Sequence, residues 1–406
     1  MTIVNNAQIN SFPYPPTKIL WRQVWGLAAL LAAITFSWIT YGFYQPRILV
    51  GLGFADLAIW LGIIQGLLGA IIEPVFGLYS DRLLGKFGSR LPQIVVGVVL
   101  AGLIFTVVSW LVKTEISEGI RWIVPLLMTT WTISMIIFRG PAMALLVEFA
   151  PTDRLPQASS ILAFVLSAVG ATSPIVSLIL KQIGASTSFI LGAIALLVGS
   201  VLLWQSMPRH IATPTSPIAI PAKFNPSHLW LYSLPFLVGF GSNLEINILL
   251  HVLSHNLFKS IGYIAVEYFQ AGLLLIASLT TLILQPWFKR LKVPYGMGLG
   301  LAAIAGCLTL AVLSQNGIYL MLIGAIASIA LGLVLINTIP LALSMVARNQ
   351  SGFGTGLFFG GSGLASALFA GLVITLGEIT PIFGALLSLF ALAISTICLK
   401  KFVNLV

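Results

Sequence analysis

The sequence predicts an all-α membrane protein, and three observations support this prediction. Of its 406 residues, 58% are hydrophobic and only 7% are charged, whereas a soluble domain carries roughly 25% charged residues. Apolar runs long enough to cross a bilayer, about 20 residues each, recur from Trp25 to Leu399. Polar and turn-forming residues interrupt these runs. We therefore expect about twelve transmembrane helices.

The apolar runs divide into two sets of six, which predicts two six-helix bundles around a central cavity. The first set is expected at 24–45, 55–79, 92–112, 121–146, 157–181 and 186–206, and the second at 228–251, 262–286, 294–313, 317–340, 352–376 and 379–399. Residues 207–227 are rich in proline, which is typical of a linker. The predicted organisation is a tail at 1–23, a bundle at 24–206, a linker at 207–227, a second bundle at 228–399 and a tail at 400–406.

The basic residues predict that both termini are cytoplasmic, because Lys and Arg stay behind in the inner loops. With the N-terminus inside, the inner segments carry Lys18, Arg22, Arg82, Lys86, Arg90, Arg154, Arg209, Lys223, Lys289, Arg290, Lys292, Arg348, Lys400 and Lys401. The outer segments carry only Arg47, Lys113, Arg121, Lys181 and Lys259. We interpret the net charge of +10 in this way and expect no nucleic acid partner. A plasma (inner) membrane location is expected.

The most specific motif is GLYSDRLLGKFGSR, from Gly77 to Arg90, between the second and third predicted spans. Gly77 lets neighbouring backbones approach. Asp81 can accept hydrogen bonds from a helix N-terminus, whose partial positive charge favours a carboxylate. The pattern resembles the loop 2–3 signature of the major facilitator superfamily. Its long form, which ends in GSRLP, is most similar to the branch of glycoside–cation symporters, sucrose carriers and PucC-type proteins.

This resemblance implies a conformational latch between the two halves on the cytoplasmic side. Its residues would be Gly77, Asp81, Arg82, Arg90, Glu148 and Arg154. Asp81 would contact the start of the eleventh helix, near 352–356, in the outward-facing state. Glu148 or Asp153 would pair with Arg82 or Arg90. The alternative is a basic turn without a switching role. Arg139, inside the fourth span, is either the fourth-helix arginine of such carriers or a residue that snorkels to the interface.

Two acidic residues at membrane depth are candidates for proton coupling, Glu73 and Glu245. A charge at this depth costs at least about 2.5 kcal/mol. The chain has only ten acidic residues, so we interpret those at membrane depth as candidates for a function. Glu73 shares one face of the second span with Gly69 and Gly77. Glu245 lies in SNLEIN, from Ser242 to Asn247, the most polar intramembrane segment.

The superfamily fold implies that the first, fourth, seventh and tenth helices line the cavity. The resulting candidates for substrate binding are Tyr41, Tyr44, Gln45, Arg47, Asn243, Glu245, Asn247 and Asn337. Aromatic rings, amides and hydroxyls suit a sugar-like or other polar organic solute. The alternative for each polar residue is an interhelical hydrogen bond.

We therefore expect a secondary active transporter that moves a small polar or amphipathic organic solute by alternating access, coupled to H⁺ or Na⁺. Its partners would be membrane lipid and the solute, and it would act as a monomer. No enzyme activity, cofactor or metal is expected, since the four histidines and two cysteines form no ligand motif. Two alternatives remain open. One is a drug/metabolite–proton antiporter, for which GATSP (Gly170 to Pro174) is a partial signal or only a proline kink. The other is a PucC-like assembly factor for pigment–protein complexes that transports nothing.

Overall fold

The computed structural model describes residues 16–114, 117–207, 229–283, 285–286 and 292–405, and these residues form helices and contain no strand. The N-terminal half comprises α1 (Trp21–Gly51), α2 (Ala55–Phe87), α3 (Leu91–Leu111), α4 (Ile123–Ala144), α5 (Leu146–Phe149), η2 (Thr152–Arg154), α6 (Leu155–Ala171), α7 (Ser173–Ile183) and α8 (Ala185–Ser206). The C-terminal half comprises α9 (Leu229–Ile248), η4 (Leu249–Leu253), α10 (Ser254–Ile261), α11 (Val266–Ile283), α12 (Val293–Leu310), α13 (Gly317–Ser344), η6 (Arg348–Gln350), α14 (Ser351–Leu376) and α15 (Pro381–Val403).

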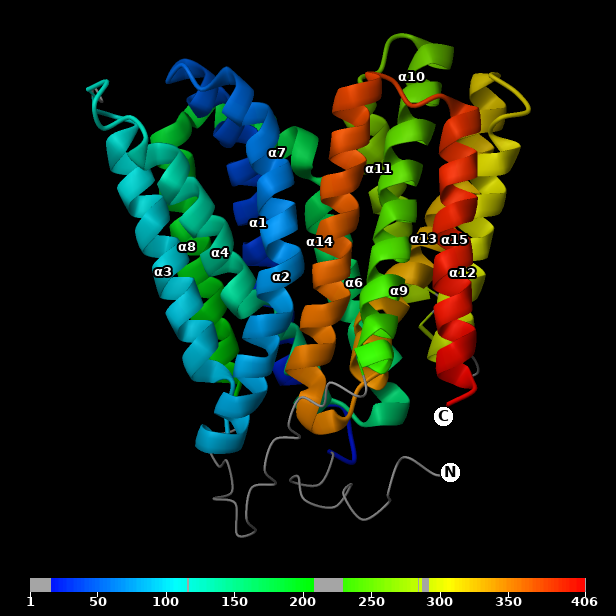
Figure 1. Ribbon diagram of the computed structural model, residues 1–406, viewed down its shortest axis with the longest axis horizontal. Coiled ribbons are helices and arrows are strands. Elements are labelled where there is room, and N and C mark those ends of the chain that lie inside the picture. The colour runs from blue at the N-terminus through cyan, green and yellow to red at the C-terminus, as the bar shows by residue number, and fades with distance from the viewer. Residues whose placement is uncertain (1–15, 115–116, 208–228, 284, 287–291, 406) are drawn as a thin grey trace.

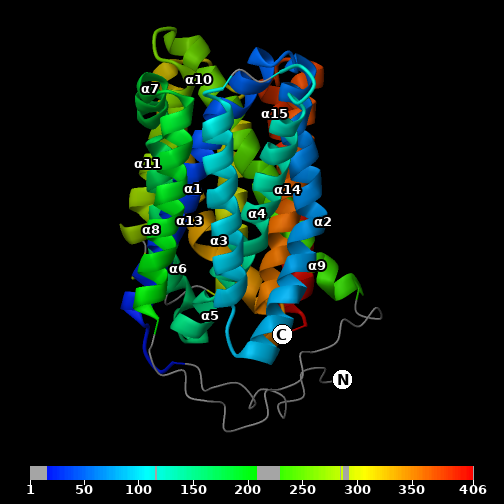
Figure 2. The ribbon, with the colours of Figure 1, turned by 90° about the vertical axis from the view of Figure 1, so that its left-hand side faces the viewer.

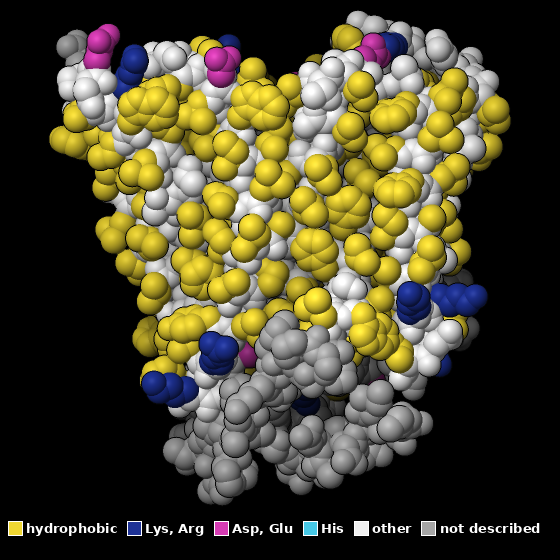
Figure 3. Space-filling model, viewed as in Figure 1, with side chains coloured by type: hydrophobic (Ala, Val, Ile, Leu, Met, Phe, Trp, Pro, Cys, Tyr) yellow, Lys and Arg dark blue, Asp and Glu magenta, His cyan; other side chains and the backbone are white. Residues whose placement is uncertain are grey.

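Twelve of these helical segments are long and apolar enough to cross a membrane, which confirms the predicted fold class. They run side by side along one axis, as two perpendicular views show (Figures 1 and 2). Large apolar side chains cover the outer surface in a broad belt (Figure 3). Ile71, Trp110 and Leu322, for example, are 69%, 65% and 62% exposed. Such a surface is stable in lipid rather than in water, so the chain is a multi-pass membrane protein.

Each half has its own apolar core, which confirms the two-bundle prediction. In the N-terminal half, the buried Trp131 ring stacks between Tyr41 and Phe105, with ring centroids 4.5 and 4.4 Å apart. The core of the C-terminal half contains Val238 and Leu301. The predicted linker at 207–227 lies outside the described residues, apart from Met207, and so does the predicted tail up to residue 15. Those boundaries stay predictions.

Several helices continue beyond their predicted ends. The helix α2 runs to Phe87, so Asp81 lies on a helix rather than in a turn, and the turn contains only residues 88–90. Gly88 ends the helix with φ of +69°, a conformation that glycine adopts without strain. The seventh span likewise continues through η4 and α10 to Ile261. The predictions ended each helix where its apolar run ends. A helix can continue past that point, because long basic side chains near its end reach the membrane interface.

The fifth span is interrupted before its proline. The helix α6 ends at Ala171 and α7 begins at Ser173, with Pro174 in its first turn. Proline has no N–H to donate to the preceding turn, so a break at this point needs no further explanation. The GATSP segment is therefore a proline-induced break in this structure.

The helix α14 joins the two halves, because it lies between α2 of the first half and α9 of the second (Figure 1). Glycines make both contacts. A Cβ atom on Gly77 would lie 2.8 Å from the carbonyl carbon of Gly352, and one on Gly356 would lie 2.9 Å from that of Glu73. On the other side of α14, a Cβ atom on Gly361 would lie 2.9 Å from the carbonyl carbon of Phe236. The backbones of three helices thus touch without side chains between them.

We predict that Gly356→Ala lowers the thermal stability of the purified protein, while Gly62→Ala does not. Overpacking a tight contact costs about 1–3 kcal/mol, and nothing lies within 4 Å of a Cβ atom built on Gly62 of α2. There, alanine gains up to about 1 kcal/mol of helix propensity. Thermal unfolding in detergent tests both variants. An unfolding temperature of Gly356→Ala equal to that of Gly62→Ala would contradict a backbone-to-backbone contact at this position.

Candidate functional site

A buried ionic cluster joins the two halves at one end of the molecule, which we call the cluster end. The carboxylate of Asp81 accepts hydrogen bonds from the backbone N–H groups of Gly352 and Phe353, at 2.9 and 2.8 Å. These groups belong to the first turn of α14, which has no partners within its own helix. The helix dipole adds a favourable charge interaction with Asp81. The predicted contact between Asp81 and the start of the eleventh span is therefore present.

Arg90 connects this contact to the fourth span. Its Nη2 donates to Asp81 Oδ1 at 2.6 Å and to Ser351 Oγ at 2.8 Å, and its Nη1 donates to Glu148 Oε1 at 2.9 Å. Arg90 is only 1% exposed, so the guanidinium is fixed among two carboxylates and a hydroxyl. A further hydrogen bond crosses between the halves, since Arg348 Nη2 donates to the carbonyl of Val147 at 3.1 Å. Every one of these links joins different membrane spans.

Two of the six residues predicted for the latch lie outside the cluster. Arg82 is exposed, and Arg154 lies 3.8 Å from the exposed Asp153. Arg82 points away from the cluster because successive residues of a helix are rotated by about 100°, so that Arg82 and Asp81 lie on different faces of α2. Gly77, Asp81, Arg90 and Glu148 do come together, with Gly77 packed against Gly352.

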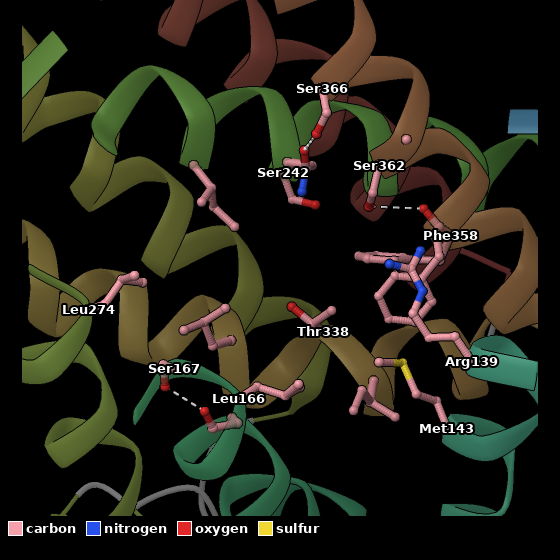
Figure 4. Close-up of a pocket in the computed structure, with 17 residues that line it drawn as sticks. Arg139, Met143, Leu166, Ser167, Ser242, Leu274, Thr338, Phe358, Ser362 and Ser366 are labelled. Carbon is pink, nitrogen blue, oxygen red and sulfur yellow. Dashed lines mark hydrogen bonds between the residues drawn. The ribbon is translucent and has the colours of Figure 1, made fainter. Parts of the chain in front are cut away.

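A cavity of about 350 Å³ lies between the two halves. Its walls come from α4 and α6 of the first half and from α9, α11, α13 and α14 of the second; they are Arg139, Met143, Ala163, Leu166, Ser167, Ser242, Asn243, Ile246, Leu274, Leu335, Thr338, Ile339, Phe358, Phe359, Ser362, Gly363 and Ser366. Figure 4 shows Arg139 and Met143 on one side and Leu274 on the opposite side. The volume is at the small end of the range for small-molecule sites.

The cationic member of a buried ion pair lies in the wall of the cavity. Arg139 of α4 donates through Nη2 to Oε1 of Glu73 on α2. The Arg139 side chain is 26% exposed and lines the cavity, whereas Glu73 is only 3% exposed and lies behind it. The guanidinium carbon also lies 5.3 Å from the centre of the Phe359 ring, within cation–π range. Arg139 thus faces the interior of the protein, which argues against the snorkelling alternative.

Asn243 is the one predicted substrate-binding residue among those that line the cavity. Its Oδ1 accepts from Ser366 Oγ at 2.8 Å and from Asn247 Nδ2 at 2.7 Å. Asn247 lies one helical turn further along the same face of α9. This amide–hydroxyl network joins α9 to α14.

Glu245 and Asn337 do not line the cavity, which corrects their predicted positions. Glu245 is fully buried and accepts from Ser388 Oγ of α15 at 3.2 Å. Two residues along a helix are about 200° apart, so Asn243 and Glu245 face opposite sides of α9. Asn337 faces Gly296 of α12 and donates to the carbonyl of Leu333 at 2.8 Å, while its neighbour Thr338 faces the cavity.

The first span does not contribute to the cavity either. Tyr41 stacks on Trp131 and accepts from Gln65 Nε2 at 2.6 Å. Tyr44 donates to the carbonyl of Leu180 at 2.5 Å, and Gln45 is buried with it in the first bundle. Arg47 is exposed and lies 3.7 Å from the centre of the Phe43 ring. Tyr41, Tyr44 and Gln45, which the sequence assigned to solute binding, are therefore buried against other residues of the first bundle.

The prediction missed most of the cavity, because it did not place the fifth, eighth and eleventh spans in its wall. One signal was available in the eleventh span. Ser362 and Ser366 follow Phe358 at intervals of four residues, so an aromatic ring and two hydroxyls share one helix face. All three line the cavity.

No protein-family model and no curated protein matches this sequence. Solved structures do match. The proton:xylose symporter XylE of the major facilitator superfamily, bound to 6-bromo-6-deoxy-D-glucose, aligns with a TM-score of 0.69 at 14% identity over 95% of this chain and 96% of that chain. The human organic anion transporter MFSD10 (TETRAN) aligns with a TM-score of 0.60 at 14% identity over 97% and 98%. The chain therefore has the fold of major facilitator superfamily transporters, as its loop motif predicted, while the finer branch stays a prediction.

We predict that Asp81→Asn opens the cluster end, because a neutral amide accepts more weakly from the N–H groups of Gly352 and Phe353, which join the halves. A hydrogen bond to a charged group contributes about 1.5–3 kcal/mol. Opening is measured by the reaction of Ser362→Cys with a membrane-impermeant maleimide applied from that side, after Cys307 and Cys398 are replaced. Each 1.4 kcal/mol by which the substitution destabilises the closed state increases the rate of labelling about tenfold. The matched control is Asp153→Asn, since Asp153 is 77% exposed and such pairs contribute little. Equal labelling in the two variants would show that the cluster does not hold this end closed.

Proposed function

We propose that this chain is a secondary transporter that moves a small organic solute across the membrane by alternating access. The observation that carries the proposal is a cavity lined by both halves together with an ionic cluster that closes one end. At the opposite end, the outline of the molecule is notched between the two halves (Figure 3). If the cluster broke and the notch closed, the cavity would become accessible from the opposite side of the membrane.

We place the cluster end in the cytoplasm and both termini with it. Arg82, Lys86, Lys400 and Lys401 all belong to the end that the positive-inside rule assigns to the cytoplasm. The structure would then be open toward the outside. A plasma (inner) membrane location and a monomeric state remain part of this proposal.

We propose Glu73 as the proton-coupling residue. Its ion pair with Arg139 lies at the cavity wall and crosses from α2 to α4, so a change in its protonation alters the charge that a solute meets. Glu245 was the other candidate, but it contacts Ser388 on the far side of α9. A proton on Glu245 has no direct contact with the cavity, and we assign Glu245 a packing role instead.

The two structural neighbours are described as a proton:xylose symporter and an organic anion transporter. Both descriptions concern small solutes, and one names the proton. They support the class of function proposed here and leave the direction of transport open. The absence of any acidic side chain among the residues that line the cavity argues against an exporter of cationic drugs.

We predict that Glu73→Gln abolishes accumulation driven by a pH gradient while solute exchange continues, because the amide cannot bind and release a proton. The measurement is uptake by proteoliposomes from a panel of radiolabelled solutes, with and without an imposed gradient. The matched control is Glu378→Gln. Glu378 lies on the exposed loop after α14, where the ammonium of Lys259 lowers the pKa of its carboxyl. Glu245→Gln should also retain gradient-driven uptake.

Two results would contradict parts of this proposal. Accumulation by Glu73→Gln at the level of Glu378→Gln would exclude Glu73 as the coupling group. If no solute of the panel moves, while the native protein co-purifies with a pigment–protein complex, the chain is an assembly factor rather than a transporter.

A further inference from the structure

The charges around the cavity indicate the class of solute. Arg139 is the only ionisable residue among the described residues that line it, and none of these residues is acidic. Glu73, which balances this charge, lies behind the guanidinium. A solute in the cavity therefore meets the cationic member of the pair. A cationic solute would find no partner there and would be repelled.

Protonation of Glu73 changes this balance. Arg139 is the charged group that faces Glu73, since α4 and α14, the two helices packed on that part of α2, contain no other charged residue. On α2 itself, the next acid is Asp81, which is held by Arg90 two turns away. On α1, the titratable Tyr41 contacts Gln65, also two turns away. When Glu73 takes up a proton, the guanidinium is therefore left without a counter-charge in a largely apolar site, which is unfavourable.

A carboxylate on the solute would restore neutrality, so the proton and the anion favour each other's binding. Arg139 can provide donors, because its hydrogen bond to Glu73 uses only Nη2 of the guanidinium. A guanidinium is well suited to bind a carboxylate through two parallel hydrogen bonds. The bound state would then carry one proton on Glu73 and one anion on Arg139.

The rest of the cavity wall fits an apolar body better than a sugar. The hydroxyls of Ser167 and Thr338 donate to backbone carbonyls of their own helices. The hydroxyl of Ser362 donates to the carbonyl of Gly239 on α9. These hydroxyls can only accept hydrogen bonds from a solute while these bonds last. Much of the remaining surface is made of aliphatic and aromatic side chains such as Leu166, Leu274 and Phe358 (Figure 4).

We infer that the solute is a small organic monoanion, a carboxylate with an apolar body, that enters the cavity together with one proton. This inference deepens the proposed function and rests on it. It replaces the sugar-like solute that the sequence suggested. It also gives Arg139 the role of a substrate-binding residue, and Glu73 controls whether its charge is free.

The test is calorimetric binding to the full-length protein in nanodiscs, with three probes of the same size: phenylacetate, phenylacetamide and phenethylamine. Phenylacetate alone should bind. At pH values where Glu73 is ionised in the free protein, the affinity for phenylacetate should rise about tenfold for each unit by which the pH falls, because one proton binds with each anion. The affinity should level off at lower pH, where Glu73 is already protonated. Titrations in buffers of different ionisation enthalpy should show one proton taken up. In Glu73→Gln, phenylacetate binding should be independent of pH and should take up no proton.

Arg139→Gln should abolish binding, and Arg47→Gln is its matched control, since Arg47 is exposed and outside the cavity. If loss of Arg139 alone destabilises the fold by leaving Glu73 unpaired, the double variant Glu73→Gln/Arg139→Gln removes both charges. It should fold and still fail to bind phenylacetate.

The inference is overturned if phenylacetamide or phenethylamine binds as tightly as phenylacetate, or if binding takes up no proton. Proteoliposome flux separates this inference from the transporter proposal. Proton-driven uptake of a neutral solute would support the transporter proposal and would overturn the inference that the solute is an anion. Proton-linked phenylacetate binding without any flux would support the anion site and contradict transport.

Discussion

A buried charge in a membrane protein must find a partner, and this constraint organises the interior of the chain. Each buried ionic contact in the described part joins different spans. Asp81 and Arg90 link α2 and the turn after it to the start of α14, and Glu73 links α2 to Arg139 of α4. A partner lost from either group leaves a charge in a medium of low dielectric, where it is unfavourable by several kcal/mol, about 3–5 in measured cases. Of these contacts, those of Asp81 and Arg90 with the first turn of α14 join the two halves, whereas the pair of Glu73 and Arg139 lies within the first half. Contacts of the first kind are expected in a two-state element, because they can form in one state and break in the other.

The glycines of α14 let these charges meet. Because Gly352 and Gly356 have no side chains, the backbone of α14 lies directly against α2, and its first N–H groups reach the Asp81 carboxylate. A side chain at Gly77 would separate the helices and with them the hydrogen bonds. Small residues also leave no interlocked side chains that would resist sliding. The same seam can therefore be tight in one state and released in another.

The fold could be predicted from the sequence because a bilayer makes each span visible as an apolar run. The contact between Asp81 and α14 was predicted too, through the motif from Gly77 to Arg90. The cavity was not, because its composition depends on helical phase and tilt. Asn243 and Glu245 are two residues apart in one polar segment, yet only Asn243 faces the cavity. Hydropathy does not show which side of a span faces a partner helix when nearly every residue is apolar.

The contrast between the two buried glutamates explains why burial alone does not define a functional acid. Glu245 is fully buried, it accepts a hydrogen bond from the Ser388 hydroxyl on a helix of its own half, and none of the described cations pairs with it. Glu245 is not among the residues that line the cavity, so a solute makes no direct contact with its carboxyl. Glu73 has a cationic partner that lines the cavity, so each proton that it gains or loses changes the net charge of the site. A carboxyl couples a proton to a solute directly where its charge is shared with the group that the solute contacts, and Glu73 is the residue that we propose for this role.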